Sequence, residues 1–182
     1  MLKGARAGVV LTSPTGDILR YVVQLYFPAT NNTTEYEGLL SGMQATSTLG
    51  IKRLLAIGDS LLVMNQVQNE FQCSDPMMTA YLVKVRRLER RLISFEVKHI
   101  PRKDNFLADK LVRLASSHQP VPVRVFEERL SQPSTAVSGQ GEGDAPLKNR
   151  APDASPLEAT PPSVSSISGG HHVVTLLNLG TT

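Results

Sequence analysis

The sequence predicts a mixed α/β fold, a sheet flanked by helices, followed by a mostly disordered tail. Over residues 1–117, apolar positions switch between strand-like and helix-like spacing in the order strand, strand, helix, strand, helix, helix, strand, helix. A hairpin followed by strand–helix units is typical of a mixed sheet with helices packed on it. Residues 118–182 contain one aromatic residue, Phe126, and are rich in Pro, Gly and Ser, so they bury too little apolar surface to fold.

A hairpin and a helix are predicted first. Residues 8–12 and 18–27 are β-rich runs, and the turn-forming residues 13–17 lie between them. Helix-start residues follow at 31–34, then apolar residues at helical spacing, with Gly50 as the stop.

The later elements alternate between strands and helices. Residues 53–58 form a largely apolar run, which favours a strand covered on both faces, as in a parallel sheet. Apolar spacing and capping residues predict the rest of the order: a short helix over 60–69, a longer amphipathic helix over 76–92, a strand over 94–100 and a final helix over 105–116.

Composition excludes several classes of protein. The single cysteine, Cys73, excludes an internal disulfide and a multi-cysteine zinc site. No apolar run approaches the roughly 20 residues of a membrane span, and no apolar segment follows the basic residues near Met1. We therefore expect an intracellular protein, in the cytoplasm or nucleus, that is not secreted. Its positive charge is concentrated in residues 1–118, which suits a nucleic-acid partner.

Three acidic residues lie where predicted strands give way to helices. They are Glu35, Asp59 and Asp109. Functional groups in open α/β sheets gather outside the carboxyl ends of strands, and converging carboxylates repel one another unless a cation lies among them. Oxygen-only ligands favour Mg²⁺ or Mn²⁺, and two such ions can promote cleavage of a phosphodiester.

Each acid also has a purely structural interpretation. Glu35 lies three residues after Asn32 and could complete a capping box. Asp59 could cap the following helix, and Asp109 could be an exposed helix charge. The alternatives stay open on these residues alone.

Three ordered motifs carry a resemblance to a known family. They are Asn-Asn-Thr-Thr-Glu-Tyr-Glu at 31–37, Gly-Asp-Ser at 58–60 followed by Val-Met-Asn-Gln-Val at 63–67, and His-Ile-Pro-Arg-Lys-Asp-Asn at 99–105 leading to Asp109. Over about residues 4–117 the chain resembles a type 1 ribonuclease H domain. More narrowly, it is similar to the reverse transcriptase-like domains of plant Ty3/gypsy-type retrotransposon polyproteins.

The resemblance implies an activity and a set of site residues. It implies two-metal hydrolysis of the RNA strand of an RNA–DNA hybrid, with a reverse transcriptase domain in a longer polyprotein as a further partner. Glu35, Asp59 and Asp109 would bind Mg²⁺ or Mn²⁺, and His99 would assist proton transfer or product release; the alternative for His99 is a solvent-facing strand end. Nucleic-acid contacts are expected from Asn32, Asn65, Gln66 and Asn105.

Basic residues of the predicted 76–92 helix are candidates for contact with the DNA strand. The candidates are Lys84, Arg86, Arg87, Arg90 and Arg91, with Lys84 and Arg87 foremost. The alternative is a solvated helix face.

The sequence departs from the family at its start. The family's first strand carries a further carboxylate in an Asp-Gly-Ser motif, and neither the motif nor the strand is found before Gly8, so we expect an N-terminally truncated domain. That strand would lie in the centre of the sheet, between the hairpin and residues 54–57. Without it, the two half-sheets could close on each other, a tail segment such as 173–177 could fill the slot, or the chain could fold poorly.

The missing carboxylate leaves three functional hypotheses. The first is a ribonuclease H whose activity is impaired in this chain. The second is a catalytically inactive nucleic-acid-binding module, and the third is an inactive remnant of a retroelement.

Overall fold

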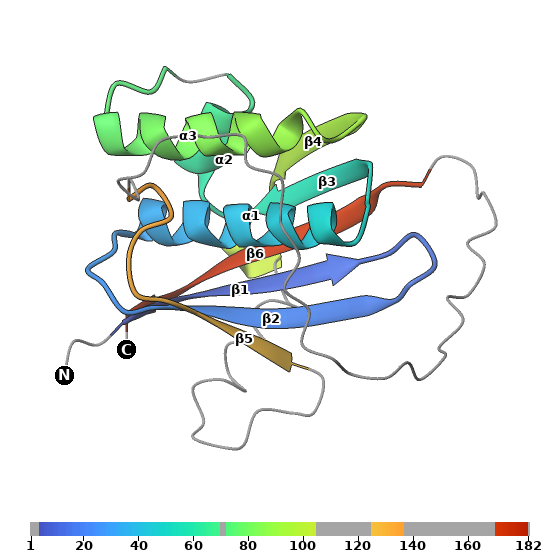
Figure 1. The fold of residues 1–182 in the computed structure, drawn as a ribbon, viewed down its shortest axis with the longest axis horizontal. Coiled ribbons are helices and arrows are strands. Elements are labelled where there is room, and N and C mark those ends of the chain that lie inside the picture. The colour runs from blue at the N-terminus through green and yellow to red at the C-terminus, as the bar shows by residue number, and fades with distance from the viewer. Residues whose placement is uncertain (1–3, 70–71, 105–124, 137–169, 182) are drawn as a thin grey trace, which may run out of the picture. The chain divides into compact units, whose positions relative to one another are not determined.

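The computed structural model describes residues 4–69, 72–104, 125–136 and 170–181, which build a sheet with helices packed on it (Figure 1). The strands are β1 (Ala5–Thr12), β2 (Ile18–Leu25), β3 (Arg53–Gly58), β4 (Ser94–His99), β5 (Val125–Leu130) and β6 (His172–Thr181). The helices are α1 (Asn31–Thr48), α2 (Leu61–Val67) and α3 (Pro76–Glu89), with a 3-10 turn at Arg102–Asp104. None of the described helices is long and apolar enough to cross a membrane.

The sheet is mixed, which confirms the predicted α/β class. Its strand order is β4-β3-β6-β1-β2-β5. β1 and β2 form the predicted antiparallel hairpin, and β3 and β4 are parallel. The predicted helix over 105–116 lies outside the described residues.

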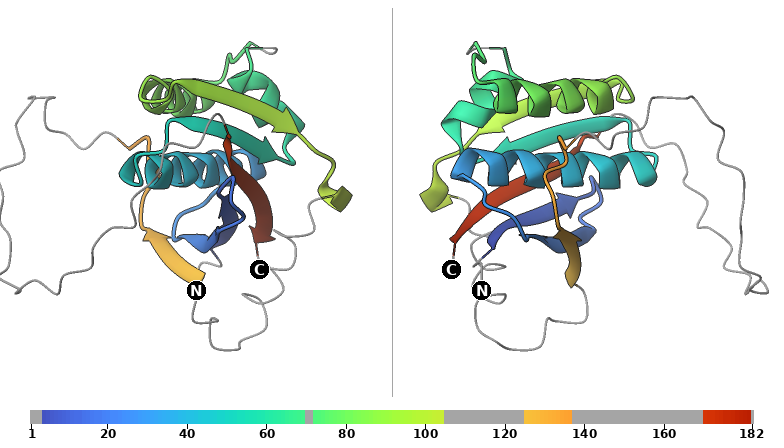
Figure 2. Two further views of the ribbon diagram at one scale, coloured as in Figure 1. Left: turned by 90° about the vertical axis from the view of Figure 1, so that its right-hand side faces the viewer. Right: turned by 60° about the vertical axis from the view of Figure 1, so that its left-hand side comes forward.

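The strand β6, from the far end of the chain, lies in the centre of the sheet. It pairs antiparallel with β1 and parallel with β3, so it joins the two halves that the sequence left without a common strand (Figure 2). Of the three outcomes considered for that slot, the structure shows the second, a tail segment that fills it. Val174 and Leu176 of this segment are fully buried, which explains why the slot accepts it.

β5 is a second ordered segment beyond residue 117. It pairs parallel with β2 at the sheet edge. These two strands differ from the expected boundary, which placed all of residues 118–182 in a mostly disordered tail. The composition of that stretch was averaged over its whole length, and the average hides two strand-length segments that carry apolar residues, VFEERL at 125–130 and HVVTLLNLGT at 172–181. Residues 118–124 and 137–169 lie outside the described residues.

Helix α1 lies closely against the central strands because two of its residues lack a side chain. A Cβ at Gly42 would lie 2.9 Å from Val174 Cγ1, and one at Gly38 would lie 3.1 Å from Ala7 Cβ. α3 runs beside α1, and the stacked rings of Tyr36 and Tyr81 join the two helices at a centroid distance of 5.3 Å. This packing fixes the N-terminal end of α1 over the end of β3.

Candidate active site

Glu35 lies near the N-terminal end of α1, a helix capped by the Thr30 side chain. Its residue is only 1% exposed, and its carboxylate lies over the end of β3, where a Cβ at Gly58 would come within 2.5 Å of Oε1. Neither carboxylate oxygen has a hydrogen-bond partner among the described residues. A buried carboxylate without partners is costly, because water has been removed and nothing has replaced it.

Asp59 follows β3 directly and lies beside Glu35. Its side chain is largely buried, and Arg102 Nε lies 3.9 Å from Asp59 Oδ2. Burial raises the pKa of Asp59, while the positive charge of Arg102 lowers it. The strand therefore delivers this carboxylate to the same corner of the molecule as Glu35.

The two carboxylates perturb each other. The pKa of Glu35 is raised from 4.5 to about 7. Burial is the larger cause, and the negative charge of Asp59 is the second. The backbone amides of Asp59 and Ser60 point toward the Glu35 carboxylate and lower its pKa, although neither reaches hydrogen-bonding geometry. The net effect is a buried acid that is half-protonated near neutral pH.

These two acids fit a divalent cation. Both donors are carboxylates, and the two oxygens of Glu35 accept no hydrogen bond from any residue that the structure describes, which suits a hard ion such as Mg²⁺ or Mn²⁺. Among the described residues, no cluster of three or more His, Cys, Asp or Glu side chains forms. The expected third ligand, Asp109, lies outside them, as does Asn105.

His99 ends β4 next to the same corner. Its Nε2 lies 3.3 Å from the backbone oxygen of Asp59, in the partly buried space beyond the strand ends. Because β3 and β4 are parallel and Gly58 is in register with His99, the sheet itself sets this proximity.

The expected nucleic-acid contacts fall into two groups. Asn32 lies in the first turn of α1 and accepts a hydrogen bond of 3.4 Å from the Ser60 hydroxyl, so it borders the carboxylates. Gln66 lies in the core instead: it is 5% exposed, and its Oε1 accepts a hydrogen bond of 2.8 Å from the Tyr36 hydroxyl. Asn65, next to it on α2, is partly exposed.

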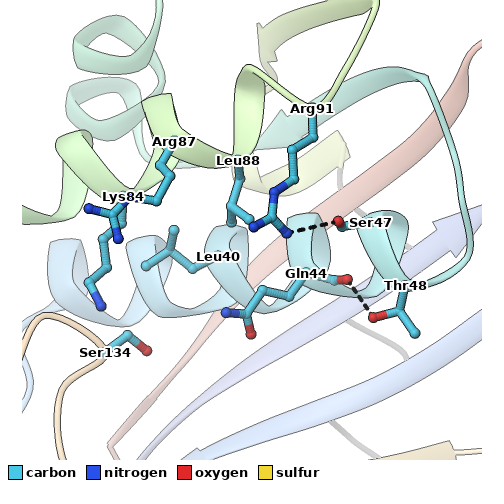
Figure 3. A pocket seen from close by; sticks show the side chains of 9 residues that line it. All are labelled: Leu40, Gln44, Ser47, Thr48, Lys84, Arg87, Leu88, Arg91 and Ser134. Atoms are coloured by element: carbon cyan, nitrogen blue, oxygen red, sulfur yellow. Dashed lines mark hydrogen bonds between the residues drawn. The ribbon is translucent and has the colours of Figure 1, made fainter. Parts of the chain in front are cut away.

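Lys84 and Arg87 lie away from the carboxylates. Both line a pocket between α3 and the C-terminal half of α1 (Figure 3). Arg86 does not share this pocket, because its guanidinium donates to Val67 O at 2.6 Å and to Asn69 Oδ1 at 2.8 Å. The basic helix face expected from the sequence is therefore divided between two directions.

Arg102 is a site residue that the sequence analysis did not single out. It lies in the 3-10 turn after β4 and places a positive charge near the carboxylates of Asp59 and Glu35. A signal was available, since Arg102 belongs to the motif at residues 99–105 that leads to Asp109.

Comparison with known proteins finds similar sequences and folds for about the first two thirds of the chain. Residues 2–115 match the family described as reverse transcriptase-like. Ribonuclease HI of Halobacterium salinarum is 32% identical over 111 residues, which cover 61% of this chain and 56% of that protein. The uncharacterized protein YpeP of Bacillus subtilis is 37% identical over 93 residues, 50% of this chain and 41% of YpeP. The chain thus spans about half the length of these relatives.

Solved structures resemble the fold over the same region. The crystal structure of RNase H1 from Halobacterium salinarum has a TM-score of 0.54 and 30% identity, covering 61% of this chain and 86% of that one. LC11-RNase H1, solved in complex with an RNA/DNA hybrid, has a TM-score of 0.53 and 25% identity, covering 59% and 82%. The chain therefore belongs to the reverse transcriptase-like family and contains a ribonuclease H-like domain.

Proposed function

We propose that this domain hydrolyses the RNA strand of an RNA–DNA hybrid in a reaction that depends on divalent metal ions. One observation carries the proposal: the buried Glu35 carboxylate has no hydrogen-bond partner among the described residues and lies beside Asp59. A protein retains such an arrangement at the rim of a sheet when a cation offsets the repulsion.

The chain's residues have distinct roles in this proposal. Glu35 and Asp59 hold Mg²⁺ or Mn²⁺, with Asp109 as the third carboxylate. With divalent ions held by these residues, the site would gain positive charge next to the scissile phosphate and a more acidic bound water. His99 carries a proton to or from the leaving group, and Arg102 holds the Asp59 side chain in place.

The substrate class is supported by a relative and by charge. LC11-RNase H1 was solved with an RNA/DNA hybrid, and this chain carries a net charge of +3. Proteins distinguish such hybrids by the shape of the minor groove and by 2′-hydroxyls, so side chains such as Asn32, at the border of the site, are suitable contacts.

The proposal extends to a retroelement setting. The order and spacing of the motifs at 31–37, 58–67 and 99–105 support an origin in a plant Ty3/gypsy-type polyprotein, where a reverse transcriptase domain would accompany this one. The match to the reverse transcriptase-like family supports that setting at a coarser level.

A second candidate function rests on the composition of β6, the strand between β1 and β3. β6 contains no Asp or Glu, so the central strand brings no further carboxylate to the rim where Glu35 and Asp59 meet. This favours a nucleic-acid-binding module that does not cleave, or an inactive retroelement remnant.

Cleavage of a labelled hybrid separates the two candidates. With the full chain and Mg²⁺, the nuclease hypothesis predicts shortened RNA products, and EDTA should abolish them. Asp59→Asn should lower the rate by more than about 100-fold, because even outer partners of metal ligands matter by ten- to a hundredfold. Glu96→Gln, which removes an exposed acid on β4, is the matched control.

The binding-module hypothesis predicts a different set of results. The wild-type chain would retain the hybrid in a salt-sensitive complex without cutting it, and Asp59→Asn would bind equally well. A chain that neither binds nor cuts would support the inactive remnant.

A further inference from the structure

An apolar pocket lies over β2 and β5, against the C-terminal half of α1. β5 pairs with β2 at the edge of the sheet, and Tyr21 and Phe126 are in register across the two strands (Figure 1). The pocket has a volume of about 350 Å³, which falls within the range of sites that hold small molecules. Its lining residues are Leu19, Tyr21, Ala45, Phe126, Glu127 and Glu128.

The walls of this pocket are mostly aliphatic and aromatic. Leu19 comes from β2 and Ala45 from α1, and the rings of Tyr21 and Phe126 come from neighbouring strands. Phe126 is 63% exposed, so a ligand has access to much of its ring. Because covering such a ring removes apolar surface from water, the walls suit the apolar group of a ligand.

The pocket also carries a negative charge that no described residue neutralises. Its lining contains two acidic residues and no basic one. Glu127 forms an ion pair of 2.7 Å with Arg129 Nε. Glu128 accepts a hydrogen bond from the Ser41 hydroxyl, a neutral donor, and forms no ion pair with any residue that the structure describes. In a chain whose overall charge is +3, this local negative charge favours a cationic ligand.

The Tyr21 hydroxyl is buried at the same place without a hydrogen-bond partner among the described residues. Tyr21 is 6% exposed, and its hydroxyl oxygen neither donates nor accepts a hydrogen bond there. Burial raises the pKa of Tyr21, the nearby Ser41 hydroxyl lowers it, and the charge of Glu128 raises it, so all three groups lie close together. Ser41 donates to Glu128, which leaves the Tyr21 oxygen available to a ligand.

These features favour one class of cation. A divalent metal ion needs several oxygen ligands, and apolar walls with one unpaired carboxylate do not supply them. A protonated primary amine needs fewer partners, because its N–H groups can donate to the Tyr21 oxygen and to the Glu128 carboxylate. The aromatic rings of the pocket would also attract its positive charge.

The pocket is distinct from the carboxylate site. Ala45 and Glu35 are ten residues apart on α1, which corresponds to about 15 Å along the helix axis. In the sheet, β2 is three strands away from β3, or about 14 Å at the usual strand spacing. A small ligand over β2 and β5 therefore does not touch Glu35 or Asp59.

We propose that this pocket binds a protonated primary amine that carries an apolar group. The ammonium lies between the Tyr21 hydroxyl and the Glu128 carboxylate, and the apolar group covers Phe126. The amine is either a small molecule or a lysine side chain of a partner protein, since both present an ammonium on an apolar stem. This site does not rest on the proposed nuclease activity.

Titrations of the full chain in EDTA test the ligand class, with the amide NMR signals of β2 and β5 as the readout. Phenethylamine should shift these signals to saturation. 2-Phenylethanol has a similar shape without the charge and should bind at least about tenfold more weakly. Nα-acetyl-lysine methylamide separates the two sources, because tighter binding than phenethylamine identifies a lysine side chain and weaker binding a small molecule. Equal binding of phenethylamine and the alcohol, or no binding of either amine, would overturn the proposal.

A charge variant tests the role of Glu128. Glu128→Gln removes the negative charge and keeps an oxygen that can accept from Ser41, so it should weaken phenethylamine binding by about tenfold or more. Glu96→Gln, which removes an exposed acid on β4, is the matched control and should change the affinity less than about twofold. An equal effect of the two variants would overturn the proposal, because overall charge alone would then explain the binding.

A second variant tests the hydroxyl of Tyr21. Tyr21→Phe should weaken phenethylamine binding by about threefold or more, because one hydrogen bond is lost. The ligand-free variant should melt no lower than the wild type, since the hydroxyl has no partner to lose among the described residues. A lower melting temperature would show that the hydroxyl stabilises the fold, and an unchanged affinity would show that it does not contact the ligand. Either result would overturn the proposal.

Discussion

Glu35 and Asp59 place two carboxyl groups close together in a largely buried volume, and burial raises the pKa of both groups. A group whose folded pKa is raised holds its proton in the native state at pH values where the unfolded chain has lost it. For Glu35 this interval runs from about 4.5 to about 7. Within it the native state binds more protons than the unfolded state, so the free energy of unfolding falls as the pH rises.

The first prediction follows for the metal-free protein. Between pH 5 and pH 8 in EDTA, the free energy of unfolding should fall, with Glu35 contributing up to about 3 kcal/mol of the loss. Glu35→Gln should remove most of this slope, because an amide does not ionise. Urea denaturation at both pH values measures it. A slope that is equal in wild type and variant would show that Glu35 ionises normally.

Added Mg²⁺ provides the second prediction. Binding to the native state alone raises the free energy of unfolding by RT ln(1 + [L]/Kd), and the ionised Glu35 binds a cation better than the protonated form. Thermal stability should therefore rise with Mg²⁺ at pH 8 and change little at pH 5. The same titration on Asp59→Asn should show a smaller rise, and an identical rise in that variant would place the ion elsewhere.

At the scale of elements, the contact between α1 and β6 depends on a missing side chain. A methyl group at position 42 would lie 2.9 Å from Val174 Cγ1, and Val174 is a stiff, fully buried side chain that cannot swing away. Helix propensity favours alanine over glycine by about 1 kcal/mol, so it opposes the steric effect.

The third prediction concerns Gly42, where the steric cost of a side chain and the gain in helix propensity oppose each other. Gly42→Ala should destabilise the protein by about 1 kcal/mol net, since overpacking costs about 1–3 kcal/mol and exceeds the gain in propensity. In a Val174→Ala background the same change should become neutral or stabilising. Denaturation of all four proteins gives the coupling energy. Additive effects would mean that α1 and β6 are not in contact.

The fourth prediction concerns the strand that joins the two half-sheets. Leu176→Ala should lower the free energy of unfolding by about 2–5 kcal/mol, because Leu176 is 1% exposed and contacts α1 at Gly38. Ile93→Ala, at a residue that is 74% exposed, is the matched control and should change stability by less than about 0.5 kcal/mol. Similar small effects at both positions would show that β6 is only loosely held.

At the scale of the whole molecule, sequence patterns predicted most of the elements and one corner of the candidate site. Strand-to-helix transitions located Glu35 and Asp59, and the parallel pairing of β3 and β4 brings His99 to the same place. These relations are local, or follow from the rule that parallel strands end at one edge. The same transitions, together with the motif spacing, predicted Asp109, which lies outside the described residues.

Other features depend on contacts that no local pattern encodes. In the sequence, β6 is one of several short apolar segments. Its position in the sheet is determined by pairing with the edges of β1 and β3, which would otherwise be unpaired. The basic face of α3 divides because Arg86 turns toward the end of α2, a contact set by how two helices meet. Gln66, which the family resemblance assigns to nucleic-acid contact, is buried and accepts a hydrogen bond from the Tyr36 hydroxyl.

The position of β6 also has a consequence for synthesis of the chain. Val9 is paired with Leu176, so β1 to β4 leave the ribosome long before the segment that unites them has been translated. During that interval the nascent polypeptide exposes two open strand edges, and chaperones or neighbouring nascent chains have access to them. Folding must then await a long-range closure, which makes maturation slow and leaves this protein sensitive to translational pauses between its halves.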